Sequence, residues 1–145
     1  MVPAVGHAKV ALMRKVPLFD GLTDHQLLQL TRLAEDVIVM AGKQLATVGE
    51  TGRQMFVIVS GRAAVNTPRG RTVRLGPGDF FGEMSLIDGE PRSATVVAET
   101  AMQLLVLGQR EFWELLVEAP QINRKIMTTL SRRLRESEAA FTPYS

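Results

Sequence analysis

The sequence contains no cysteine among its 145 residues and only two histidines, His7 and His25. Without cysteine, the chain forms neither a disulfide framework nor a thiolate metal site. Both histidines precede the region where strands are expected, so we predict no metal centre, no cofactor and no Ser-His catalytic arrangement there. The sequence also lacks an apolar run of ~20 residues and an N-terminal apolar segment of the signal-peptide kind. We therefore expect a cytoplasmic domain that is not an enzyme and has no membrane partner.

Charge is almost balanced, with 17 basic and 15 acidic residues and a net charge of +2. Two stretches, residues 53–74 and 124–135, nevertheless carry several basic residues and no acidic one. Such stretches suit nucleic acid or an acidic partner. Solvated faces of strands and of a helix explain them as well, and we favour that interpretation. The 46% of hydrophobic residues is enough for one globular domain with a core.

The N-terminal part shows a helical pattern. Residues 6–15 are predicted to form a short helix that ends before Pro17. Thr23 is followed three residues later by Gln26, which predicts a capping box. The leucines that follow predict a second helix running to about Ala34.

The C-terminal part shows a second helical pattern. Residues 109–117 carry an apolar stripe, and we expect Trp113, the sole tryptophan, to anchor it in the core. Pro120 fits the first turn of another helix. Apolar residues then recur every four positions, which predicts a long amphipathic helix to roughly Ala140.

The middle of the chain is different in character, with short β-branched and apolar runs between glycine-containing turns. Roughly seven or eight such runs, spaced about 8–12 residues apart, are typical of an antiparallel sandwich or jelly roll. The expected strands are residues 37–40, 45–48, 55–59, 63–66, 72–75, 95–98 and 102–107.

Residues 76–97 combine turn glycines with charged side chains suited to a phosphorylated sugar. Gly82 permits a close backbone approach, and a short helical turn is expected from Glu83. The N–H groups that begin such a turn favour an anion. Arg92 adds a permanent charge with a fork of donors that matches phosphate oxygens, and Ser93 adds a hydroxyl. An ionised Glu83 only accepts hydrogen bonds, so it suits a sugar hydroxyl.

Residues 81–94, FGEMSLIDGEPRSA, closely resemble the phosphate-binding cassette of cyclic-nucleotide-binding domains. This family includes bacterial catabolite activators, regulatory subunits of cAMP-dependent kinase and cyclic-nucleotide-gated channels. The residues at the family's spacing are Gly82, Glu83, Leu86, Arg92, Ser93 and Ala94.

The resemblance implies a mainly β fold with flanking helices: an antiparallel β jelly roll, or double-stranded β-helix. Residues 1–145 would form a single domain. An N-terminal helical bundle would occupy residues 1–34, the β-roll residues 35–108, and C-terminal hinge and lid helices residues 109–140.

The resemblance also implies a regulatory sensor that binds a cyclic nucleotide and signals by movement of its C-terminal helices. Arg92, Ser93 and the backbone N–H groups near Met84 and Ser85 would hold the cyclic phosphate, and Glu83 the ribose 2′-hydroxyl. Domains that favour cGMP often carry threonine at the position of Ser93, so serine there favours cAMP without excluding cGMP.

Three further residues complete the candidate site by resemblance. Val73 would contact the purine, Arg133 would pair with Glu83, and Ser137 would meet the edge of the base. The candidate ligand-binding residues are Gly82, Glu83, Met84, Ser85, Arg92, Ser93, Ala94, Val73, Arg133 and Ser137. Candidates for the apolar hinge of the cassette are Phe80, Phe81, Met84 and Leu86.

Several partners and alternatives stay open. The C-terminal helix is a possible homodimer interface, and an effector protein is expected but not identified. Direct DNA binding is not expected, because only the five residues FTPYS follow Ala140, too few for a helix-turn-helix domain. The alternatives are a docking or dimerisation module without a ligand, or a regulatory fragment of a larger channel, kinase or transcription regulator. Met1 argues against a fragment.

Overall fold

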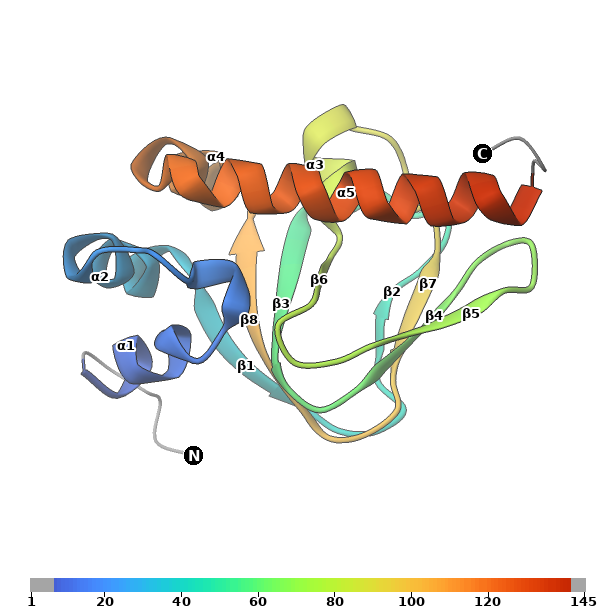
Figure 1. Cartoon of the computed structure of the whole chain (residues 1–145). Helices are drawn as coiled ribbons and strands as arrows, with labels where there is room; N and C mark the ends of the chain where they lie inside the picture. Colours follow the sequence, from blue (N-terminus) through green and yellow to red (C-terminus); the bar gives the residue numbers. More distant parts are fainter. Residues whose placement is uncertain (1–6, 142–145) are drawn as a thin grey trace.

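The computed structural model describes the backbone of residues 7–141 and the side chains of residues 9–136. Helices gather at one end of a β-roll, and one long helix crosses the roll (Figure 1). The helical elements are α1 (His7–Arg14), the 3₁₀ turn η1 (Pro17–Phe19), α2 (Asp24–Leu33), α3 (Glu83–Asp88), α4 (Gln109–Glu118) and α5 (Pro120–Phe141). The strands are β1 (Glu35–Val39), β2 (Gln44–Ala46), β3 (Gln54–Ser60), β4 (Ala63–Asn66), β5 (Thr72–Leu75), β6 (Phe80–Phe81), β7 (Thr95–Ala98) and β8 (Met102–Gly108).

Two four-stranded antiparallel sheets form the roll, which confirms the expected jelly-roll architecture. One sheet has the order β1-β8-β3-β6 and the other β2-β7-β4-β5. The two-residue strand β6 was not expected from the sequence, where Phe80 and Phe81 read only as an apolar pair. It pairs with β3, placing Phe81 opposite Phe56, and the two rings stack with centroids 4.8 Å apart. This pairing fixes the start of the cassette against the sheet.

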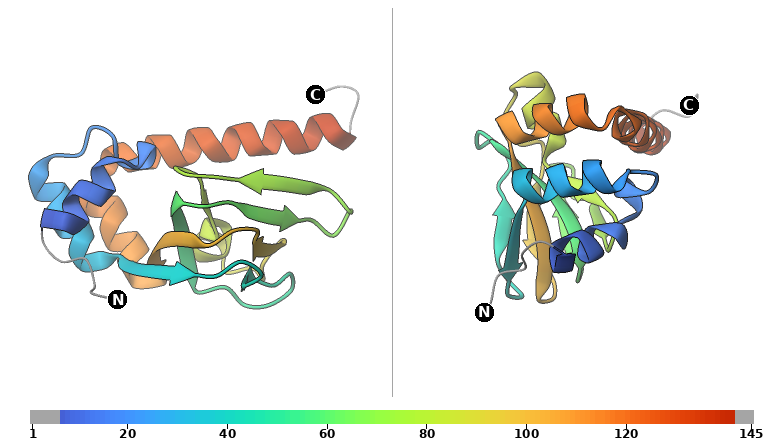
Figure 2. Two further views of the ribbon diagram at one scale, coloured as in Figure 1. Left: turned by 90° about the horizontal axis from the view of Figure 1, so that it is seen from below. Right: turned by 90° about the vertical axis from the view of Figure 1, so that its left-hand side faces the viewer.

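The central strand β8 is buried on both faces and separates two apolar cores. Leu104 and Val106 belong to the core between the sheets, whereas Leu105 and Leu107 belong to the core shared with the helices. This division follows from the alternation of side chains along a strand. The helices therefore pack on one sheet only, and Figure 2 shows them collected at that side of the roll.

The expected helices are present, with one correction. Gln26 N donates to Thr23 Oγ1 at 3.1 Å, and Thr23 N donates to Gln26 Oε1 at 3.0 Å, so the capping box at α2 is confirmed. Trp113 was wrongly expected to anchor the core: it is 44% exposed, whereas Phe112 is fully buried. The buried stripe of α4 follows Phe112 and Leu115, and position 113 turns about 100° away from it.

Polar contacts to the N-terminal helices hold the first turns of α5 in place. Lys125 Nζ donates to the carbonyl of Pro17 at 3.2 Å, and Gln121 Nε2 donates to Gln26 Oε1 at 2.7 Å. These contacts direct the remainder of α5 across the cassette, as Figures 1 and 2 show. Among the described residues, no helix is long and apolar enough to cross a membrane, and no cluster of ligating side chains would hold a metal ion.

Candidate functional site

The cassette folds around two glycines with left-handed backbone conformations. Gly82 precedes α3 with φ of 90°, and Gly89 ends that helix with φ of 72°. A Cβ atom at Gly82 would lie 2.6 Å from the carbonyl oxygen of Gln54 and 2.7 Å from Nη1 of Arg92. No larger residue fits without displacing the backbone, so the close approach expected at Gly82 is confirmed. The predicted helical turn is present and extends to Asp88.

Arg92 is half-buried and bridges two backbone segments. Its Nη1 donates to the carbonyl of Gly82 at 2.8 Å, and its Nη2 donates to the carbonyl of Gln54 at 2.7 Å. The guanidinium also lies against Gly52, where a Cβ would come within 2.1 Å of Nε. Burial lowers the pKa of Arg92, and the nearby Glu83 carboxylate opposes that shift. The side chain is therefore a charge held at a fixed place rather than a mobile surface arginine.

Glu83 is the most deeply buried charged residue of the site, with 2% exposure. Its Oε1 accepts from Nη1 of Arg133 at 3.2 Å, whereas its Oε2 has no hydrogen-bond partner among the described residues. Burial raises the pKa of Glu83, against the opposing effects of Arg133, its own backbone N–H and Arg92. A buried acceptor without a donor costs about 1–3 kcal/mol, which a ligand hydroxyl would offset.

Arg133 joins α5 to the cassette in two ways. Besides its ion pair with Glu83, its Nη2 donates to the carbonyl of Phe80 at 2.6 Å. Its guanidinium carbon lies 4.8 Å from the centroid of the Phe80 ring, within range of a cation–π interaction. The pairing of Arg133 with Glu83 expected from resemblance is thus confirmed, and the position of α5 depends directly on the buried carboxylate.

The remaining candidate residues differ in how far their side chains are exposed. Ser85 is buried, Ala94 and Val73 are partly buried, and Ser93 is exposed. Of the candidates for the apolar hinge, Phe80, Phe81 and Leu86 are buried, whereas Met84 is 51% exposed. Their role as a hinge stays a prediction. The side chain of Ser137 lies outside the described residues.

A half-open hollow of about 440 Å³ lies beside Arg92, at the mouth of the roll between β2 and β3. Thr47, Gln54 and Phe56 are among its lining residues, and Glu83 is not. Sequence reasoning missed the part played by Gln54 and Gly52 in holding Arg92. The glycine at position 52 was a usable signal, since it marks a close approach. The carbonyl of Gln54 was not, because every residue carries one.

An antiparallel jelly roll that holds a buried, incompletely paired carboxylate beside a fixed guanidinium defines a small-molecule-binding domain. Comparison with known proteins gives the particular family. The profile described as the cyclic nucleotide-binding domain matches residues 37–119, more than half of the chain. The chain belongs to the cyclic nucleotide-binding domain family, and its expected family and jelly-roll fold are confirmed.

The relatives that share this domain include a channel and a receptor protein. A cyclic nucleotide-gated potassium channel of Rhizobium etli is 46% identical over 84% of this chain and 34% of the channel. A cyclic AMP receptor protein of Thermus thermophilus is 32% identical over 87% of this chain and 61% of that protein. The crystal structure of the Thermus thermophilus catabolite activator protein superposes with a TM-score of 0.74, at 32% identity, covering 86% of this chain and 61% of that one. The chain thus spans about a third of the channel that it matches.

Proposed function

We propose that this domain is a sensor that binds cAMP in preference to cGMP and signals through α4 and α5. The observation that carries the proposal is the buried, unpartnered Oε2 of Glu83 next to a fixed arginine. A ribose 2′-hydroxyl would donate to this oxygen, and a cyclic phosphate would lie toward Arg92. The pairing of a sugar acceptor with a phosphate donor within one short segment favours a ligand that carries both groups.

The phosphate would be held by Arg92, Ser93 and the N–H groups of Met84 and Ser85. Two of the five guanidinium N–H donors of Arg92 bond to backbone carbonyls, which leaves donors for an anion. Gly82 and Ala94 would keep the backbone close to the ligand on either side.

The preference for one base over another would depend on residues that contact the purine, at the end of the ligand away from the phosphate. Val73 is a partly buried residue of β5 and would contact the purine, and Ser137 would meet its edge. The serine at position 93 favours cAMP, and the Thermus thermophilus relative is itself named for cyclic AMP.

Signalling would follow because Arg133 and the ribose share one carboxylate. Arg133 donates to Oε1 of Glu83, and the ribose would donate to Oε2, so a bound nucleotide changes the charge and position of the group that ties α5 to the cassette. A ligand that binds two positions of α5 unequally shifts their populations. The hydrogen bond from Arg133 to Phe80 and its stacking on that ring support this proposal, because they join α5 to the hinge as well.

The identity to a potassium channel favours one particular setting, in which the domain regulates a channel within a longer protein. In that setting the unidentified output lies in another part of the protein. A docking module without a ligand is the opposing candidate, and the two differ in nucleotide affinity.

Isothermal titration calorimetry with cAMP and cGMP tests the proposal, on the unsubstituted chain and on two matched variants. We expect cAMP to bind more tightly than cGMP. Arg92→Ala should reduce cAMP affinity by about 2–5 kcal/mol, the cost of removing one partner of a desolvated charge pair. Arg74→Ala removes an exposed arginine of β5 and should leave affinity unchanged.

Equal affinities of the Arg92→Ala variant and the unsubstituted chain would refute the phosphate assignment. Absence of binding by the unsubstituted chain would favour the docking module instead. Thermal unfolding of the two variants without nucleotide controls for loss of fold.

A further inference from the structure

The outer face of α5, opposite the cassette, carries charge and apolar surface that no described part of the chain covers. The inward face buries Ile122 and Ile126 and directs Arg133 to Glu83. The outward face forms an open depression of about 820 Å³. Its lining residues are Pro120, Asn123, Arg124, Met127, Thr128, Ser131, Arg132, Arg135 and Glu136.

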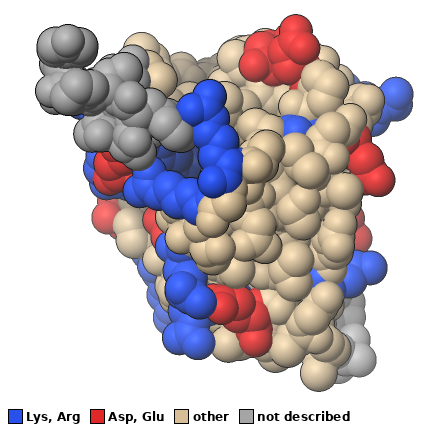
Figure 3. Space-filling view, turned by 90° about the vertical axis from the view of Figure 1, so that its right-hand side faces the viewer, with Lys and Arg blue, Asp and Glu red and all other residues tan. Residues whose placement is uncertain are grey.

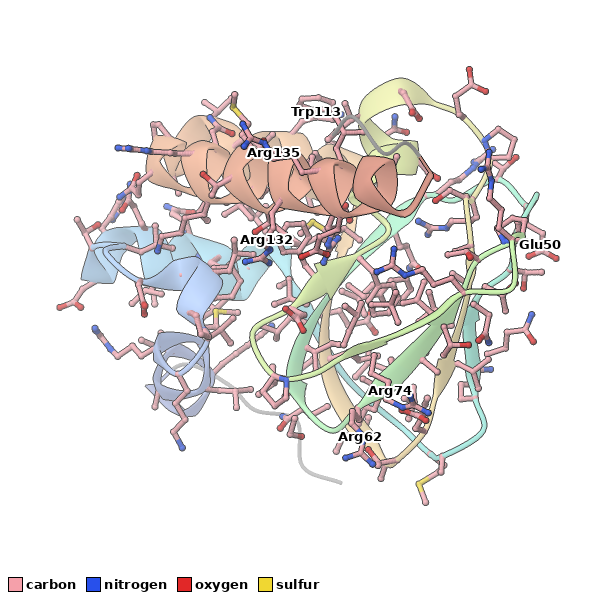
Figure 4. All side chains as sticks on the ribbon, turned by 45° about the vertical axis from the view of Figure 1, so that its right-hand side comes forward. Glu50, Arg62, Arg74, Trp113, Arg132 and Arg135 are labelled. Atoms are coloured by element: carbon pink, nitrogen blue, oxygen red, sulfur yellow. The ribbon has the colours of Figure 1, made fainter. Side chains whose placement is uncertain are left out.

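Arginines dominate this depression. Arg124, Arg132 and Arg135 are exposed, and none of them forms an ion pair with a carboxylate of the described residues. Among the described residues that line it, Glu136 is the only acidic one. In Figure 4, Arg132 and Arg135 project from α5 on different sides of the helix axis. Other arginines do form ion pairs, such as Arg62 and Arg74 with Glu99. Figure 3 shows acidic and basic side chains around a largely uncharged face at the end of the molecule where α5 ends.

Apolar surface accompanies the charge. Met127 is 67% exposed and Leu134 is 60% exposed, and they lie seven residues apart, two helical turns along one side of α5. Thr128 and Ser131 are small residues between the arginines, which permits another helix to approach closely. Apolar side chains at this spacing, flanked by charge, are the features by which one helix recognises another.

The register of the arginines argues against a second copy of this chain as the occupant. Arg124 and Arg135 are eleven residues apart, about three full turns, so both lie on the same line of the helix surface. If two copies of α5 packed in parallel, each arginine would face itself. If they packed antiparallel and crossed between residues 129 and 130, the middle of this face, Arg124 would face Arg135. Both arrangements bring like charges together.

We infer that the outer face of α5 is a docking surface for an acidic amphipathic helix of a partner protein. Carboxylates of the partner would pair with Arg124 and Arg135, while its apolar residues would cover Met127 and Leu134. The inference goes beyond nucleotide binding, because Arg133 and the cassette lie on the other side of α5 and need not change for the helix to bind.

Fluorescence anisotropy tests the inference with two synthetic helices of about 20 residues, long enough to hold helical structure. Both carry leucines at i, i+3, i+4 and i+7; one flanks them with glutamate and the other with lysine. The titrations contain no nucleotide, so their result is separate from that for cAMP. We expect the glutamate helix to bind, the lysine helix not to bind, and the affinity to fall as salt increases.

Variants make the test specific. Arg124→Glu combined with Arg135→Glu should weaken the glutamate helix at least about tenfold and allow the lysine helix to bind. The control combines Lys43→Glu with Arg71→Glu, two exposed residues of loops, and changes net charge equally while leaving affinity unchanged.

Three outcomes would overturn the inference. The glutamate helix fails to bind the unsubstituted chain, or it binds the reversed variant equally well. Alternatively, sedimentation velocity shows a dimer that Met127→Asp converts to a monomer, which assigns the face to a second copy. Circular dichroism melting of each variant confirms that these exposed substitutions leave the fold intact.

Discussion

Glu83 in the cassette and Glu99 beside strands β4 and β5 both form ion pairs with arginine, but Glu83 is buried and Glu99 is partly exposed. Glu83 is 2% exposed and contacts Arg133 through one oxygen only. Glu99 is 26% exposed and contacts Arg74 at 3.1 Å and Arg62 at 3.7 Å, two arginines that are each at least 60% exposed. Figure 4 shows Arg62 and Arg74 together on the outside of the roll.

The comparison shows that identical residue types have different consequences in water and in the interior. An exposed pair gains little, because water and salt screen the attraction and both side chains lose freedom. A buried carboxylate loses its hydration, and its remaining lone pairs must find donors. Glu99 therefore contributes slightly to stability, whereas Glu83 keeps an unmet demand for a donor. That demand is what makes the cassette, and not the β4–β5 side, a site for a ligand.

The largest difference between the two glutamates should appear in nucleotide affinity. Glu83→Gln removes the charge that strengthens the hydrogen bond to the ribose hydroxyl, and we expect cAMP affinity to fall about 10- to 100-fold. The variant should also lose discrimination between cAMP and its 2′-deoxy analogue. Calorimetry with both ligands measures these effects.

Glu99→Gln provides the control for this measurement, and its cAMP affinity should equal that of the unsubstituted chain. Unchanged affinity in Glu83→Gln, or a similar loss in both variants, would contradict the assignment of the ribose to Glu83.

A second difference concerns pH. Burial raises the pKa of Glu83 above its ordinary value, so the folded state binds the proton more tightly than the unfolded state does. Stability from this group is fully present below the unfolded pKa of about 4.3 and is lost as pH rises through the folded pKa. Relative to Glu83→Gln, the unsubstituted chain should therefore gain stability as pH falls from neutral toward that value. Urea unfolding of both proteins between about pH 5 and pH 8 measures the difference. A constant difference across this range would show that the carboxyl does not change its protonation on folding.

Sequence reasoning found the roll because its signals are local. The bounds of β4, β5 and β7 match the expected ones, since alternating side chains and turn glycines mark them. The cassette could be predicted equally well, because its backbone requires glycine at position 82 and its charge requires arginine at position 92, and both residue types can be read from the sequence. The sequence did not show which side of the helix at residues 109–117 is buried, and Trp113 was therefore wrongly predicted to lie in the core.

The contacts of the charged side chains could not be predicted from residue type alone. The pairing of Arg133 with Glu83 joins residues 50 positions apart, and only resemblance to a family indicated it. The support of Arg92 by the Gln54 carbonyl had no signal at all, since a backbone oxygen is the same in every residue. The roles of Val73, Ser93 and Ser137 toward a ligand stay predictions.

The smallest expected effect belongs to the exposed cluster. Glu99→Gln should lower the free energy of unfolding by about 0–1 kcal/mol, the usual range for surface ion pairs. The two arginines would repel each other weakly, but both extend into water and can separate. Urea unfolding in low salt and in about 1 M NaCl, where charges are screened beyond about 3 Å, separates this contribution from packing: the loss should vanish in high salt. A loss well above 1 kcal/mol that persists in high salt would show that Glu99 holds its arginines as firmly as a buried carboxylate does. Burial would then not be what distinguishes the two glutamates.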